Sequence, residues 1–245
     1  MRNYPGKKDG TVYRNREVHY CSQKFTNFVR SIVFWTLLAV SLGTGSQVMA
    51  GDSSAEGPRI LPVDEQDLPE HLKQLKNSNP RIARLNIIRT MARHPELHKA
   101  WSKFAGYIIR NSTLPDRDRE LATLRIGWLC KAEYEWSQHT VMAKAVGVTE
   151  AEIEQVILGS TGNWNEFDRA LMTAVDELHT SSSITDVTWR QLSSHYSEQQ
   201  MMDLVFTVGQ YTLVSMALNS FGVEIDEGYS GFPESSMKEP GITAN

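Results

Sequence analysis

Apolar residues recur every three or four positions along most of the chain between residues 63 and 225, and the alternation typical of β-strands is almost absent. The two clearest runs start at Asn79 and His94, each followed directly by a proline. Their apolar positions are Ile82, Leu85, Ile88 and Met91 in the first run and Leu97, Trp101, Phe104 and Ile108 in the second. Because this spacing puts each set on one helix face, the pattern predicts one helix from residue 80 to 91 and another from residue 95.

Polar residues that cap helices stand at the start of the later segments. Thr149-x-x-Glu152 and Ser197-x-x-Gln200 have the form of capping boxes, and helix starts are also predicted at Asn165 and Thr185. The last segment, from Glu198 to Leu218, is apolar on more than one side, which is typical of a central helix or of one in an oligomer contact. The chain is therefore predicted to be all-α.

The first 50 residues have the form of a targeting segment. A basic region precedes the apolar run 32–40, and small or neutral residues lead to Ala50, after which cleavage by a signal peptidase is expected. The segment therefore predicts export, to the periplasm or out of the cell. Two alternatives stay open. One is an uncleaved membrane anchor, although polar residues from Gly43 to Gln47 interrupt the apolar run early; the other is a true start codon near Phe25.

The rest of the chain is divided into a linker at 51–62, one domain at 63–225 and a tail at 226–245 that is expected to be flexible. The central stretch of roughly 160 residues suits one domain with its own core. The formal net charge is −4 and no basic stripe is interleaved with aromatic residues, so nucleic acid is not an expected partner. Contact with a membrane is expected only if residues 1–50 are retained as an anchor.

Candidate chemistry lies in the segment from Leu114 to Gly147. Glu135 and His139 stand four residues apart, so on one helix their side chains share a face and can touch. A carboxylate that orients and charges an imidazole can move protons near neutral pH. Ala132 and Ala143 flank the pair on the same face. A polar pair among such small apolar residues indicates a functional or structural role. The alternative is a solvent-facing pair, which would stabilise its helix by only about 0.3 to 0.5 kcal/mol.

This segment resembles the carboxymuconolactone decarboxylase family, one branch of which is the alkyl hydroperoxidase D proteins. The resemblance is densest from Leu114 to Ile157 and continues to Phe221. It implies an alkyl hydroperoxidase D-like helical bundle in which two antiparallel helices carry the motif to one pocket. His139 matches the family's histidine and Glu120 its upstream glutamate. The resemblance further implies a homo-oligomer, a trimer or a hexamer.

One departure from the family bears on the chemistry. In the hydroperoxidase branch a Cys-x-x-Cys pair ends four residues before the histidine, and those positions are Ala132 and Glu135 in this chain. Peroxide reduction by that route needs an attacking thiolate and a second, resolving thiol. Only Cys21 and Cys130 are present, and Cys21 lies in the segment expected to be removed. Cys130 is therefore interpreted as a small packed side chain, with a one-cysteine peroxidase as the alternative.

Glu120 can join the pair only if the helix breaks. In one straight helix Glu120 and Glu135 would lie about 22 Å apart, at 1.5 Å per residue. A turn between Gly127 and Ala132 is therefore required, and the resemblance implies one there. Gly127 and the polar Lys131 are the only local support for it.

Arg125 and three aromatic residues complete the candidate site. Arg125 lies within an otherwise apolar face and is a candidate clamp for a substrate carboxylate. Tyr134 is a candidate donor to an oxyanion, and Trp128 and Trp136 are candidates for a substrate wall. For the three aromatic residues, the alternative is a place in the core.

Two other clusters have more ordinary interpretations. Arg117 and Arg119 are expected to pair with the acids at positions 116, 118 and 120 around a helix start. His94 and His98 have the spacing of two metal ligands on a helix, but Pro95 lies between them and no third ligand is placed to complete the set. No metal site is expected.

The leading hypothesis is a cofactor-free lyase of the carboxymuconolactone decarboxylase-like class, acting on a small organic acid, lactone or enolisable carbonyl. The decarboxylase branch resembles this chain in having a carboxylate, not a thiol, four residues before its histidine. His139 would act as general acid or base, Glu135 would orient it or take the proton, and Glu120 would relay protons or bind substrate. The alternatives are a peroxidase that uses Cys130 and a non-catalytic helical protein that binds an apolar ligand.

Overall fold

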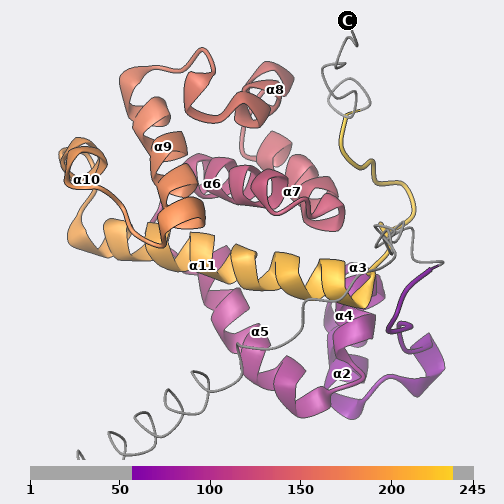
Figure 1. The fold of residues 1–245 in the computed structure, drawn as a ribbon. Helices are drawn as coiled ribbons and strands as arrows, with labels where there is room; N and C mark the ends of the chain where they lie inside the picture. Colours follow the sequence, from indigo (N-terminus) through magenta and orange to yellow (C-terminus); the bar gives the residue numbers. More distant parts are fainter. Residues whose placement is uncertain (1–56, 234–245) are drawn as a thin grey trace, which may run out of the picture. The chain divides into compact units, whose positions relative to one another are not determined.

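Helices form the regular structure of residues 57–233, the part of the chain that the computed structural model describes, and no strand occurs in that part (Figure 1). This confirms the all-α prediction. The α-helices are α2 (Glu70–Ser78), α3 (Pro80–Arg84), α4 (Asn86–Met91), α5 (Pro95–Arg110), α6 (Asp116–Leu129), α7 (Glu133–Ala145), α8 (Glu150–Leu158), α9 (Glu166–Ser181), α10 (Asp186–Ser193) and α11 (Glu198–Phe221). Two short 3-10 helices, η1 (Glu65–Asp67) and η2 (Gly159–Thr161), precede α2 and follow α8.

Helix α6 is the most enclosed element of the domain. It packs against α7, α8, α9 and α11, and every residue from Asp118 to Gly127 is buried. Because the helix is covered on all sides, its buried side chains include charged ones. These are Asp118, Arg119, Glu120 and Arg125. Buried charges need partners to offset their lost hydration, and the partners of Glu120 define the candidate site.

Helix α11 crosses the domain and contacts α5 as well as α6, α7 and α9 (Figure 1). By length and composition it is apolar enough to cross a membrane, but 56% of its apolar window is buried inside the domain, as expected for a core helix. The predicted central helix is thereby confirmed. Part of its surface stays apolar and exposed, at Met202, Phe206, Leu213 and Met216.

The predicted helix starts are confirmed. Thr149 and Ser197 each form a complete capping box, in which the cap side chain and the residue three positions later exchange hydrogen bonds with backbone N–H groups. Asn165 caps α9 and Thr185 caps α10. These local signals place the ends of the helices that surround α6.

The predicted helix from residue 80 to 91 is wrong in one respect, because it is interrupted at Leu85. That residue has φ −58° and ψ 133°, outside the helical region. The N–H of Asn86 donates to Oδ1 of Asp226 at 2.8 Å. This hydrogen bond to a residue 140 positions later takes the place of a hydrogen bond within a helix. The spacing of apolar residues could not predict it.

Both ends of the described chain pack against the domain more closely than predicted. Asp226, assigned to a flexible tail, accepts hydrogen bonds from the Tyr134 hydroxyl at 2.6 Å and from Gln138 Nε2 at 3.0 Å. Residues 226–233 therefore belong to the folded unit. In the predicted linker, the N–H groups of Arg59 and Ile60 donate to the Phe221 carbonyl. The predicted targeting segment lies outside the described residues.

Candidate active site

A tight turn between α6 and α7 brings the two parts of the motif together. Lys131 has a left-handed backbone with φ 54°, which is uncommon for a residue with a side chain. The N–H of Ala132 donates to the Gly127 carbonyl at 2.9 Å and closes the turn. The predicted break between Gly127 and Ala132 is confirmed, and the two helices pack side by side (Figure 1).

The imidazole of His139 is held by Glu120. Nδ1 of His139 lies 2.7 Å from Oε2 of Glu120, and the two residues are 6% and 1% exposed. A carboxylate at one ring nitrogen fixes the orientation and tautomer of the imidazole and leaves the other nitrogen, Nε2, for chemistry. Among the described residues no hydrogen bond joins Glu135 to His139. The orienting role that the sequence assigned to Glu135 is therefore taken by Glu120.

A short network of charges keeps Glu120 ionised. Its Oε1 accepts from Nε and Nη2 of Arg119 at 3.3 and 3.2 Å, and Arg119 also binds Asp116. Burial alone would raise the pKa of Glu120, but His139 and Arg119 outweigh burial and hold this pKa below its ordinary value. Glu120 is thus a buried carboxylate at neutral pH. The expected pairing of Arg119 with neighbouring acids is confirmed.

The pKa of Glu135 is shifted in the opposite direction. It is 2% exposed, and its Oε1 accepts a hydrogen bond from Ser215 at 3.2 Å, whereas its Oε2 is buried without a partner in the described part of the chain. Burial raises the pKa of Glu135 well above its ordinary value, despite the contact with Ser215. Burial therefore favours the neutral form of this acid, which stands one helical turn before His139. Two carboxyl groups with pKa values driven apart are typical of acid and base partners.

Gly127 makes room for this acid. A Cβ atom built on Gly127 would lie 3.1 Å from Oε1 of Glu135, closer than ordinary contacts allow. The glycine that supports the turn thus also accommodates the buried carboxyl. This explains why a glycine stands inside α6, where it costs helix stability relative to alanine.

Helix α11 supplies two residues that the sequence analysis missed. The ring of Tyr211 packs edge to face against His139, with centroids 4.6 Å apart and planes at 81°. Burial and the nearby charge of Glu120 raise the pKa of Tyr211 well above its ordinary value, so its hydroxyl stays neutral. Ser215, one turn later, donates to Glu135. The available signal was the presence of polar residues within a helix that is otherwise apolar and central.

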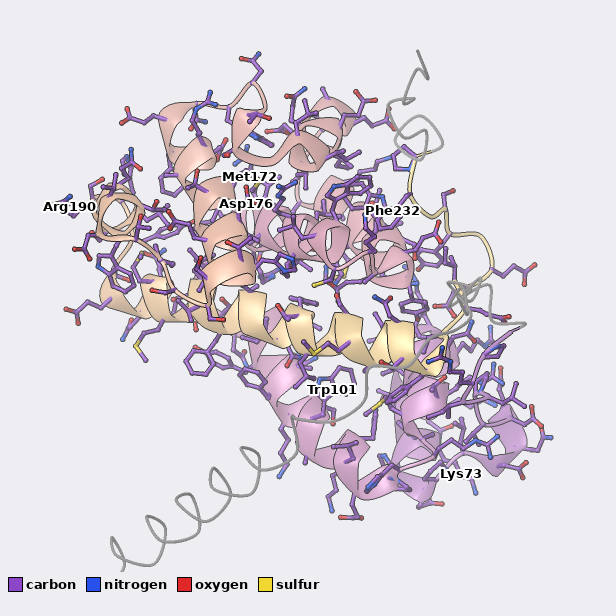
Figure 2. The ribbon with its side chains drawn as sticks, viewed as in Figure 1. Lys73, Trp101, Met172, Asp176, Arg190 and Phe232 are labelled. Carbon is purple, nitrogen blue, oxygen red and sulfur yellow. The ribbon has the colours of Figure 1, made fainter. Side chains whose placement is uncertain are left out.

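Arg125 was a candidate clamp for a substrate carboxylate, but its guanidinium is bound by groups of the protein itself. Its Nε is 2.6 Å from Asp176, and its Nη1 donates to the carbonyls of Val156 and Ile157 at the end of α8. Figure 2 shows Asp176 on α9. A Cβ atom on Gly159 would lie 2.3 Å from this guanidinium, so the arginine fills the space beside that glycine. The structure therefore gives Arg125 no contact with Glu120, Glu135 or His139.

The aromatic candidates take part in packing. Tyr134 is 5% exposed and donates to Asp226, and burial together with that carboxylate raises its pKa well above the ordinary value. Trp128 and Trp136 form a cluster with Phe232, with ring centroids 4.8 to 5.6 Å apart. Phe232 lies beside the α6–α7 pair (Figure 2). The structure thus favours the core interpretation for all three residues over a substrate wall.

Cys130 is partly buried at the end of α6, and its Sγ lies 3.9 Å from Nδ1 of His179. Burial raises the pKa of the Cys130 thiol. A raised pKa lowers the fraction of thiolate, the form that attacks peroxides. The geometry favours the interpretation of Cys130 as a packed side chain.

The two histidines with metal-ligand spacing face different partners. His94 caps α5 by accepting from the Leu97 N–H at 3.2 Å. His98 is buried, and its Nδ1 lies 3.1 Å from Nε2 of His71 on α2. No group of three histidine, cysteine or acidic side chains suited to a metal ion occurs within the described residues.

One family model matches the part of the chain that contains these residues. Residues 95–174 match the model of the carboxymuconolactone decarboxylase family, and this region contains Glu120, Glu135 and His139. No curated protein matches the chain.

Several solved structures share the fold. An uncharacterized peroxidase-related protein from Ralstonia eutropha JMP134, described as an alkylhydroperoxidase AhpD core, is 16% identical with a TM-score of 0.62, over 71% of this chain and 95% of that one. A peroxidase-related protein from Silicibacter sp. TM1040 is 12% identical with a TM-score of 0.62, over 72% and 97% of the two chains. The debrominase Bmp8 is 17% identical with a TM-score of 0.58, over 69% and 92%. The chain therefore has an alkyl hydroperoxidase D-like fold, and about a third of it, residues 95–174, is similar to the carboxymuconolactone decarboxylase family.

Proposed function

We propose that the chain is a cofactor-free enzyme that moves protons on a small organic acid, lactone or enolisable carbonyl. The observation that carries the proposal is the buried 2.7 Å hydrogen bond between Glu120 and His139. It orients an imidazole in the same enclosed region as the neutral acid Glu135. A general base and a general acid in one water-poor site are the requirement for enolisation.

In this proposal the two carboxyl groups have separate roles. Nε2 of His139 takes a proton from the carbon next to the substrate carbonyl, and Glu120 stabilises the imidazolium that forms. Glu135 donates its proton to the carbonyl oxygen, where negative charge develops. The product is an enol. The imidazolium of His139 then delivers the proton to a different carbon of the enol system, and the enol returns its O–H proton to Glu135, which completes an isomerisation.

The same groups serve a decarboxylation. When the bond between the α-carbon and the carboxylate of a β-keto acid breaks, its electron pair forms an enolate and carbon dioxide leaves. Glu135 protonates the enolate oxygen. The imidazolium form of His139 then delivers a proton to the carbon, and the enol returns its O–H proton to Glu135 as the ketone forms again. Neither route requires Cys130.

Two features support a small substrate. Glu120, Glu135 and His139 are each no more than 6% exposed, so the site is enclosed. Oε2 of Glu135 is buried and makes no hydrogen bond to any described residue, and in this proposal a substrate oxygen is its partner. The debrominase Bmp8, which has a similar fold, has been crystallised with 2,3,4-tribromopyrrole, a small ring compound.

The proposal is tested by following solvent deuterium into substrate carbon by NMR, with carbon dioxide release measured in parallel. The panel consists of β-keto acids and unsaturated γ-lactones. Glu120→Gln, Glu135→Gln and His139→Asn are each expected to lower kcat by about 10²-fold or more, the range of acid–base catalysis. Glu154→Gln is the matched control because Glu154 is exposed on α8. Full activity of His139→Asn, or no exchange with any compound of the panel, would contradict the proposal.

A further inference from the structure

Arg119, the arginine beside the candidate site, already has its charge offset by carboxylates of the protein. Its Nε and Nη2 donate to Oε1 of Glu120, and its Nη1 donates to Asp116, so all three guanidinium nitrogens have acceptors. Its side chain is only 6% exposed, which encloses it with these partners. Two carboxylates therefore surround one guanidinium, and Arg119 has no free charge to offer a substrate.

The other two arginines of α6 are also bound by the protein. Arg117 donates to Asp168 and Glu152, and Arg125 donates to Asp176 and to two backbone carbonyls. Neither guanidinium donates to an acid–base residue in the part of the chain that the structure describes. The arginines of α6 are thus each held by carboxylates of the chain, and none of them is placed to bind a substrate carboxylate.

The positive charge that His139 gains on protonation is offset in the same way. Its Nδ1 lies 2.7 Å from Oε2 of Glu120, so the imidazolium forms directly beside an ionised carboxylate. The pair is neutral overall when His139 is protonated and carries one negative charge when it is not. A substrate anion that approaches the ring therefore meets either no net charge or a repulsive one.

Two side chains near His139 show that their surroundings disfavour negative charge. Burial raises the pKa of both Glu135 and Tyr211, and the charge of Glu120 adds to this effect at Tyr211, whose ring centroid lies 4.6 Å from that of the imidazole. The hydrogen bond from Ser215 lowers the pKa of Glu135 without outweighing burial, and no cation contributes. The same burial and the same carboxylate act on any other anion beside these side chains.

We propose that the site takes uncharged enolisable carbonyl compounds, such as lactones, ketones and esters, and binds carboxylates weakly. The proposal rests on the proposed acid–base function and narrows its substrates. A carboxylate that enters an enclosed site loses its hydration, and only a cation or several donors offset that loss. A neutral carbonyl loses much less, and one hydrogen bond from the carboxylic acid of Glu135 offsets it. The charge balance therefore favours proton transfer on an uncharged carbonyl over decarboxylation of a keto acid.

The test compares three small compounds built on one five-carbon skeleton. Levulinate and methyl levulinate carry the same ketone and differ in charge, and α-angelica lactone is an uncharged cyclic form. Incorporation of solvent deuterium into carbon is followed by NMR with the full chain, and exchange with His139→Asn is subtracted as background. We expect kcat/KM for the ester and the lactone to be at least 10-fold higher than for levulinate.

Asp116→Asn tests whether charge causes this preference. The substitution removes one of the two carboxylates that offset Arg119, and the Asp116 side chain is 67% exposed, so the variant is expected to fold. The ratio of kcat/KM for levulinate to that for methyl levulinate should rise by about 5-fold, the range of one exposed ion pair. Asp186→Asn, on the exposed surface of α10, is the matched control and should leave the ratio unchanged.

Exchange of levulinate that equals or exceeds exchange of its ester would overturn the proposal and still support the acid–base function. An unchanged ratio in Asp116→Asn would overturn the assignment of the preference to charge. If no compound exchanges, the acid–base function fails, and ligand-observed NMR decides between the remaining outcomes. Saturable binding of methyl levulinate that is weakened in Glu135→Ala, with levulinate bound at least 10-fold more weakly, would keep the proposal. Equal binding of the two compounds, or binding of neither, would overturn it.

Discussion

The carboxylate of Glu120 lies 2.7 Å from Nδ1 of His139, although nineteen residues separate them in the chain. The distance depends on the left-handed residue Lys131, which reverses the chain between α6 and α7. Because both side chains are buried, the contact is shielded from salt and solvent, and a change at either end should affect stability as well as chemistry.

Replacement of Glu120 by glutamine should destabilise the protein most at neutral pH. The pKa of Glu120 is lowered on folding, so its contribution is complete above the unfolded value of about 4.3 and is lost as pH falls through the lower folded value. Removal of one partner of a buried pair costs about 3–5 kcal/mol. Urea unfolding at pH 7 and at pH 3 should therefore show a large difference from wild type at pH 7 and a smaller one at pH 3. A constant difference would mean that Glu120 is not ionised in the folded state.

Glu135→Gln should show the opposite pH dependence. The pKa of Glu135 is raised on folding. Its contribution is therefore complete below about pH 4.3, and it decreases as pH rises because the unfolded chain releases a proton that the folded chain keeps. The wild type should lose up to about 1.4 kcal/mol per pH unit relative to the variant. Urea unfolding from pH 4 to 8 measures this, and parallel curves would show that Glu135 is ionised when folded.

The contact between Gly127 and Glu135 can be isolated by a double-mutant cycle. Gly127→Ala in the wild type forces the Glu135 carboxyl away from a Cβ atom at 3.1 Å, and overpacking of this kind costs about 1–3 kcal/mol. In a Glu135→Ala background the same change should stabilise by up to about 1 kcal/mol, because alanine favours the helix. Equal effects of Gly127→Ala in both backgrounds would show that the two residues are uncoupled.

Arg125→Gln should affect stability and leave the chemistry unchanged. Its guanidinium binds Asp176 and two carbonyls at the end of α8. Because Asp176 is only partly buried, the loss should be smaller than the roughly 3–5 kcal/mol of a fully buried pair. A lower Tm with an unchanged kcat at temperatures where the variant is folded is the expected result. Arg190→Gln, on the exposed surface of α10, is the control. A lower kcat with an unchanged Tm would instead support a role for Arg125 in substrate binding.

Cys130 should react slowly with iodoacetamide at pH 7, because burial raises the pKa of its thiol. The measurement uses a Cys21→Ser background, so that one thiol remains. Cys130→Ala should leave any activity of the protein unchanged. Rapid alkylation, or loss of a peroxide-reducing activity in Cys130→Ala, would favour the one-cysteine alternative.

Local signals predicted much of the fold. The capping boxes at Thr149 and Ser197 and the caps at Asn165 and Thr185 depend on residues within three positions, so a sequence pattern contains all the information they need. The break at Leu85 was missed because its cause, the bond from Asn86 to Asp226, is made between distant parts of the chain.

The sequence predicted most residues of the candidate site, but it did not predict which of them contact each other. Spacing on one helix placed Glu135 and His139 on a shared face, and both are buried there. Spacing could not show that a second helix places Glu120 closer to the imidazole, or that burial would leave Glu135 protonated. Tyr211 was missed for the same reason, because its contact with His139 joins two helices that are far apart in the chain.

The bonds of Asp226 set a limit on how far the chain can be shortened. The Asp226 carboxylate accepts hydrogen bonds from the N–H of Asn86, at the break between α3 and α4, and from the hydroxyl of Tyr134 on α7. Phe232, six residues later, packs against Trp128 and Trp136. A protein trimmed to end at residue 225 would lose all three attachments at once. The shortest version that keeps the natural packing of the aromatic cluster therefore has to include Phe232.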